Sequence, residues 1–196
     1  MPIKVSLKEI ASVHAGYLFR EAIQPSLTGA VAVLQAKDVE SDEPIVETST
    51  FSVISQAPVR TEAYLQKNDV VLVARAAGPG GFRSTVFRTS GMRVVASASI
   101  LIVRLKSLLI IPEYLALYLN SVQGQRQLGE DLSGATIKAI PRQALEDLEI
   151  SLPSLEVQKQ IVALHDIIRK KEHLYFRKIQ IERSMLNYLL QSDNLK

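Results

Sequence analysis

Cysteine is missing from this sequence of 196 residues, which excludes disulfides and thiolate metal sites and fits a reducing compartment. Long apolar runs are missing as well. No stretch reaches the roughly 18 apolar residues that a membrane-spanning helix requires. The N-terminal stretch MPIKVSLKEIASV also lacks the uninterrupted apolar run of a signal peptide. We therefore expect a soluble protein of the cytoplasm.

Catalytic motifs are also missing. No Asp or Glu is followed two residues later by Lys, so the acidic half of a common nuclease site is absent. The three histidines, His14, His165 and His173, do not have the spacing of metal ligands. The glycine-rich GPGG at 78–81 lacks the Gly-Lys-Ser/Thr end of a phosphate-binding loop. We predict no catalytic site, no metal and no cofactor, and binding is the first hypothesis.

Short apolar runs separated by turn residues fill the first three quarters of the chain. Four runs rich in Val, Ile and Leu read as strands, at 30–35, 69–75, 92–97 and 99–105. A helix is predicted over 111–121, where Pro112 suits the first turn, and a shorter one is predicted from Pro141. The pattern predicts an α+β fold, with a β-rich globular domain over 1–154 and a long helix over 155–196.

The C-terminal segment repeats apolar residues every seven positions. Ile167, Leu174, Ile181 and Tyr188 form one series, and Val157, Leu164, Lys171, Lys178 and Met185 form a companion series. Such spacing indicates a partner helix, although the two lysines weaken the seam. We predict pairing through Val157, Leu164, Ile167, Leu174 and Ile181. At 1.5 Å per residue, the helix from Leu155 to Leu190 is about 54 Å long, and we expect it to project from the smaller globular domain.

Charge is concentrated in one segment. Residues 60–110 carry eight basic and two acidic side chains, a net charge of +6, whereas the whole chain carries +3. A local basic excess is typical of a surface that binds a polyanion, and an ordinary solvated basic face is the alternative interpretation.

Several stretches, read in order, resemble the target recognition domain of type I restriction–modification specificity subunits. They are VSLKEIASVHAGYLF, AVAVLQAKDV, LQKNDVVLVARAAGPGGF, IIPEYLALYLNS and SGATIKAIPRQALEDLEISLPSLEVQKQIV. The last one is the most specific, because it parallels a Gly-x-Thr segment, a strand ending in Leu-Pro and the start of a long helix. The resemblance covers essentially the whole chain.

This resemblance implies a protein that does no chemistry itself. Such subunits read double-stranded DNA, hold methyltransferase subunits and, through them, a restriction subunit. The usual member has two recognition domains and two long antiparallel helices, whereas this chain has one of each. We therefore expect a homodimer that reads an inverted repeat, with domain centres up to roughly 16 base pairs apart, given the helix length and a 3.4 Å rise per base pair.

Two loops carry the residue types that contact DNA. Lys and Arg bind phosphates, arginine bonds guanine through two donors, and small polar side chains also reach base edges. We predict contacts from Arg75, Arg83, Ser84, Thr85 and Arg88 in the first loop, and from Ser133, Thr136, Lys138 and Arg142 in the second. The alternative function is a protein–protein adaptor with a docking helix and no base reading. An enzyme is a third class, for which the sequence offers no site.

Overall fold

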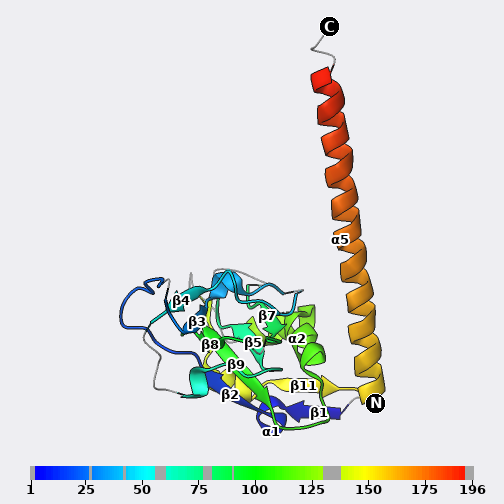
Figure 1. Cartoon of the computed structure of the whole chain (residues 1–196). Coiled ribbons are helices and arrows are strands. Elements are labelled where there is room, and N and C mark those ends of the chain that lie inside the picture. Colours follow the sequence, from blue (N-terminus) through cyan, green and yellow to red (C-terminus); the bar gives the residue numbers. More distant parts are fainter. Residues whose placement is uncertain are drawn as a thin grey trace. The chain divides into compact units, whose positions relative to one another are not determined.

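The computed structural model describes residues 3–26, 28–41, 43–55, 61–76, 81–89, 91–129 and 138–192 (Figure 1). The chain forms two compact units, Met1–Lys159 and Gln160–Lys196. The strands of the described part are β1 (Ile3–Ser6), β2 (Ala11–Ala15), β3 (Val31–Leu34), β4 (Ser52–Ile54), β5 (Val70–Val73), β6 (Arg75–Ala76), β7 (Ser84–Val86), β8 (Arg93–Ala96), β9 (Ile100–Leu105), β10 (Lys138–Ala139) and β11 (Glu149–Leu152). The helices are α1 (Leu7–Ile10), α2 (Pro112–Asn120), α3 (Val122–Gly129), α4 (Arg142–Glu146) and α5 (Leu155–Ser192), with 3₁₀ turns η1 (Ala36–Asp38) and η2 (Thr61–Ala63).

Two sheets form the body of the first unit. One has the antiparallel order β2-β9-β5-β7, and the other has the order β4-β3-β8, in which β3 and β8 are parallel. Their strands lie close together in Figure 1, and one apolar cluster contains residues of both sheets. That cluster includes Leu34 of β3, Val71 of β5 and Ile102 of β9, all of them fully buried. All four residues of β3 and of β5 are buried, which explains why these runs are continuously apolar instead of alternating.

Helix α2 covers one side of the four-stranded sheet, where it packs against β7 and β5. Pro112 occupies its first turn, as the sequence predicts. On the other side of the helix, Tyr114 donates its hydroxyl proton to the Ser151 carbonyl, at 2.6 Å. Tyr118 donates in the same way to the Glu149 carbonyl, at 3.0 Å. Helix α2 therefore joins the sheet to β11, the last strand before α5.

The two ends of the first unit meet in a separate ladder. Strand β1 pairs antiparallel with β11, with Ile3 opposite Leu152 and Ser6 opposite Glu149. Next to this ladder, Lys8 of α1 lies with its Nζ atom 2.7 Å from the Asp147 Oδ1 atom at the end of α4. The start of the chain is thus fixed beside the start of α5.

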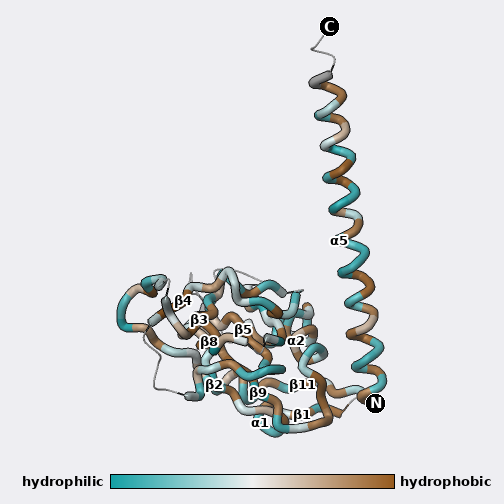
Figure 2. The backbone as a smooth tube through the Cα atoms, viewed as in Figure 1, coloured by the Kyte–Doolittle hydropathy of each residue, from teal (hydrophilic) through white to brown (hydrophobic). Residues whose placement is uncertain are grey.

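Helix α5 begins in the first unit and forms the described part of the second unit from Gln160 onward. It runs without a break over 38 residues, about 57 Å at 1.5 Å per residue. Figure 2 shows apolar and hydrophilic positions recurring along its length. The predicted long helix, the four predicted strands and the helix at 111–121 are confirmed, and so is the α+β class. None of the described helices is long and apolar enough to cross a membrane.

Candidate nucleic-acid interface

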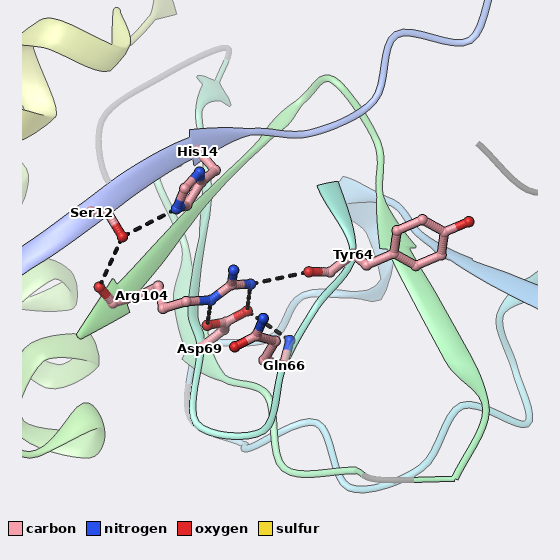
Figure 3. Close-up of polar contacts among 6 residues, drawn as sticks. All are labelled: Ser12, His14, Tyr64, Gln66, Asp69 and Arg104. Atoms are coloured by element: carbon pink, nitrogen blue, oxygen red, sulfur yellow. Dashed lines mark hydrogen bonds and ion pairs between the residues drawn. The ribbon is translucent and has the colours of Figure 1, made fainter. Parts of the chain in front are cut away.

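Arg104 belongs to the basic segment, but its guanidinium binds inside the first unit. Its Nε atom lies 2.9 Å from Asp69 Oδ1, and its Nη2 atom lies 2.7 Å from Asp69 Oδ2 (Figure 3). The same Nη2 donates to the Tyr64 carbonyl at 3.1 Å, and the Gln66 N–H donates to Asp69 at 2.7 Å. Asp69 is only 2% exposed, so Arg104 balances a buried carboxylate and has a structural role.

His14 lies beside this ion pair. Its Nε2 atom is 3.1 Å from the Ser12 hydroxyl (Figure 3). Burial lowers the pKa of His14 below its ordinary value, and the positive charges of Arg104 and Arg142 lower it further.

Three more arginines of the segment also have partners within the first unit. Arg83 donates from Nη2 to the Ala36 carbonyl at 2.8 Å. Arg88 forms an ion pair with Glu113 and donates to the Asn68 amide oxygen at 2.7 Å. The guanidinium carbon of Arg93 lies 4.4 Å from the centre of the Tyr64 ring. Much of the local basic excess is therefore used for packing, and the net charge of the segment overstates what its surface offers to DNA.

Ser84 and Thr85 are predicted to contact DNA from a loop, but the structure places both in strand β7. Their side chains are 0% and 3% exposed. The Ser84 N–H donates to the Asn120 amide oxygen at 2.8 Å, and the Thr85 hydroxyl donates to the Glu43 carbonyl at 2.6 Å. Buried side chains in a paired strand cannot reach a base edge, so we remove both residues from the interface.

A two-stranded ladder brings the two predicted loops together. Strand β6 pairs antiparallel with β10, which sets Arg75 opposite Ala139 and Ala76 opposite Lys138. The Ile140 N–H extends the ladder by donating to the Ala74 carbonyl at 2.8 Å. Arg75 and Ala139 are exposed. Segments about sixty residues apart in the sequence thus share one edge, and Arg75 is the predicted DNA residue of the first loop that this edge presents.

The second loop is only partly described. Lys138 lies in β10 by its backbone, whereas Ser133 and Thr136 lie outside the described residues. Arg142 begins α4, and its Nε atom lies 2.7 Å from Glu146 Oε1 in an ion pair whose arginine side chain is 53% exposed. Arg142 therefore remains at the surface with its charge partly balanced.

The geometry of the β6–β10 ladder suits one kind of ligand. A two-stranded ribbon fits the major groove of duplex DNA, and an exposed arginine on such a ribbon can reach guanine. Within the described ranges, no group of His, Asp or Glu residues could hold a metal ion.

Sequence reasoning missed two amide side chains that position this unit, the half-buried Asn120 and the fully buried Gln158. Asn120, at the end of α2, donates to the carbonyls of Ser41 and Ser84 at 2.9 and 2.8 Å, and so fixes β7. Gln158, in the first turns of α5, accepts from the Ile111 N–H at 3.0 Å. It also donates to the carbonyls of Leu109 and Pro153, at 2.8 and 3.0 Å. Residue type gives no signal for Gln158, because the helix start LEVQKQIV contains other polar residues as well.

Solved structures with the same fold come from type I restriction–modification systems. One is titled "Structural basis underlying complex assembly and conformational transition of the type I R-M system"; it has a TM-score of 0.70 and 21% identity, and the match covers 95% of this chain and 43% of that one. The HsdS subunit from Thermoanaerobacter tengcongensis has a TM-score of 0.62 and 19% identity, over 90% of this chain and 39% of that one. The S subunit of the type I restriction–modification system from M. genitalium has a TM-score of 0.57 and 18% identity, and the match covers 93% of this chain and 42% of that one.

This chain thus spans less than half of the length of each of these solved chains. No curated protein matches it. The family of the Type I restriction modification DNA specificity domain matches residues 3–183, nearly the whole chain. The chain belongs to this family of type I restriction–modification specificity domains.

Proposed function

We propose that this chain is a half-length DNA specificity subunit of a type I-like restriction–modification system. It reads DNA through its first unit and carries no catalytic site. It pairs with a second copy through α5, so that two recognition domains read a bipartite inverted repeat. It also holds methyltransferase subunits and, through them, a restriction subunit.

The observation that carries DNA reading is the β6–β10 ladder. It joins the two loops that the sequence singled out, and it presents the exposed Arg75 on a ribbon of a size that enters the major groove. The backbone of Lys138 belongs to the same ladder.

One observation supports pairing through α5. The predicted pairing residues leave apolar surface on the helix: Leu164, Ile167 and Leu174 are 58%, 57% and 64% exposed. Burying an apolar side chain of this size contributes roughly 1.5–3 kcal/mol, which favours a helix partner along the seam.

The test of DNA reading is Arg75→Ala, with Lys67→Ala as the matched control. Lys67 is also exposed, but it lies in the turn before β5 and outside the β6–β10 ladder. We expect Arg75→Ala to weaken binding and to lower the slope of log affinity against log salt by about one. Lys67→Ala should leave both unchanged. Equal effects of the two substitutions would show that the ladder is not the interface.

The adaptor function has one observation in its favour. Arg83, Arg88, Arg93 and Arg104 all have partners inside the first unit, which reduces the charge available to a polyanion. An adaptor would bind duplex DNA weakly and without sequence preference, while still associating with methyltransferase subunits. Fluorescence anisotropy over a salt series, with two unrelated duplexes, separates the two functions.

A further inference from the structure

Helix α5 carries a third seven-residue series that the sequence analysis missed. Ile161, Ile168, Tyr175, Glu182 and Leu189 follow one another at this interval. This series alternates at spacings of three and four with the companion series that contains Leu164, and such alternation forms the seam of a coiled coil. Ile168 and Tyr175 are 46% and 60% exposed on the helix surface. The seam runs from Ile161 to Leu189, all within the second unit.

Three charged residues interrupt this seam, and their signs constrain the partner. Lys171 and Lys178 belong to one series, and Glu182 belongs to the other. In a parallel, in-register pair of α5 helices, each would face the same residue of the other copy. Lysine would face lysine and glutamate would face glutamate, which is destabilising. Charge therefore disfavours a parallel pair.

An antiparallel pair brings residues of the two series face to face. When Lys171 is set opposite Glu182 of the partner subunit, the remaining contacts are fixed by the helix repeat. Leu164 then faces Leu189, Ile168 faces Met185, and Tyr175 faces Lys178 of the other copy. The apolar residues meet apolar residues, and the Lys178 ammonium meets the face of a tyrosine ring, a favourable cation–π contact. Because the pair has two-fold symmetry, each of these contacts occurs twice.

Shifting this register by seven residues sets charged side chains against apolar ones in either direction. One shift sets Glu182 against Leu164 and Lys178 against Ile168. The opposite shift keeps a charge match, Lys178 against Glu182, but sets Lys171 against Leu189. Within one helix, Lys178 Nζ lies 3.7 Å from Glu182 Oε1. In the matched register Glu182 would thus lie between Lys178 of its own helix and Lys171 of the partner.

We propose that two copies of α5 pair antiparallel in this single register, selected by the reciprocal Lys171–Glu182 ion pairs. The proposal rests on the homodimer of the proposed function and adds its orientation, its register and its selecting residues. The Ile167 series flanks this seam and stays at the edge of the pair. The two lysines, which weaken a seam in isolation, become the residues that specify the partner.

Cross-linking tests the register directly, because the chain has no cysteine of its own. A full-length variant with Leu164→Cys and Leu189→Cys should form disulfide-linked dimers under mild oxidation, since the two positions face each other across the pair. Either single substitution should give no linked dimer. Linked dimers from Leu164→Cys alone would indicate a parallel pair, and efficient linking of Leu164→Cys with Glu182→Cys would indicate the shifted register. Either result would overturn the proposal.

Charge reversal tests the selecting ion pair. We expect Lys171→Glu to raise the dimer Kd about ten-fold, Glu182→Lys to do the same, and the double variant to recover wild-type affinity. Lys170→Glu is the matched control, because Lys170 lies next to Lys171 but off the seam. A double variant that stays weak contradicts the register while leaving the homodimer standing. A wild type that is monomeric at tens of micromolar overturns the homodimer itself.

Discussion

The pair of Asp69 and Arg104 shows that a basic residue can suggest DNA binding in the sequence and yet have a structural role. Arg104 adds to the basic segment, yet it neutralises a carboxylate that is 2% exposed. We predict that Arg104→Met lowers the free energy of unfolding by about 2–4 kcal/mol, because the buried Asp69 carboxylate would lose its two hydrogen bonds from the guanidinium. Urea denaturation measures this difference. Lys106→Met, at a neighbouring exposed lysine, should change stability by less than about 0.5 kcal/mol.

His14 gives the first unit a pH dependence of known sign. Burial, helped by Arg104, lowers its folded-state pKa, so the unfolded chain binds a proton more readily than the folded one. The stabilisation is complete above the unfolded value of about 6.5 and is lost as the pH falls below it. We predict that the urea midpoint falls between pH 7 and pH 5, and that it falls less in His14→Gln. An identical fall in both proteins would assign the pH dependence to other groups.

At the scale of elements, Gln158 fixes the first turns of α5 to the segment that leads into α2. Its side chain is fully buried and makes three hydrogen bonds to backbone groups. We predict that Gln158→Leu costs about 1–3 kcal/mol, because one N–H and two carbonyls lose their hydrogen-bond partner beside a fully buried side chain. Gln160→Leu, two residues further along and exposed, is the control and should be nearly neutral. Thermal unfolding of the three proteins provides the comparison.

The local sequence pattern predicted the elements in which apolar residues are continuous or recur at a regular spacing. Strands β3, β5, β8 and β9 and helices α2 and α5 all carry a periodicity that neighbouring residues reveal. Strand β7 does not, since its residues are Ser84, Thr85 and Val86. It is a strand because Thr85 pairs with Val71 and because Asn120 bonds the backbone of Ser84. Contacts over such sequence separations leave no local signal, and β7 was therefore read as a loop.

The candidate interface also depends on contacts between distant segments, which the local sequence does not reveal. The two loops were identified from residue type, but the ladder that joins Arg75 to Ala139 could not be read from either loop alone. The partners of Arg83, Arg88 and Arg104 likewise come from other segments, namely Ala36, Glu113 and Asp69. Residue type indicates which side chains are able to bind DNA. Only the fold shows which of them are already occupied.

At the scale of the whole molecule, the proposed function depends on the association of two copies of the chain. One recognition domain reads one half-site, and two copies related by a two-fold axis read two identical half-sites in opposite orientation. The register proposed for α5 sets the offset between the two helices, and the account therefore expects one preferred spacing of the two half-sites. A site recognised by two domains that could slide past each other would instead show several spacings.

Selection of bound duplexes from a random DNA pool tests this account most directly. The account predicts that the wild-type chain enriches an inverted repeat with a single spacer length, and that Arg75→Ala enriches it with lower contrast. Lys171→Glu, which weakens the pair, should shift the enriched sequences toward isolated half-sites. Enrichment of no sequence at all, or of a motif without two-fold symmetry, would contradict the account.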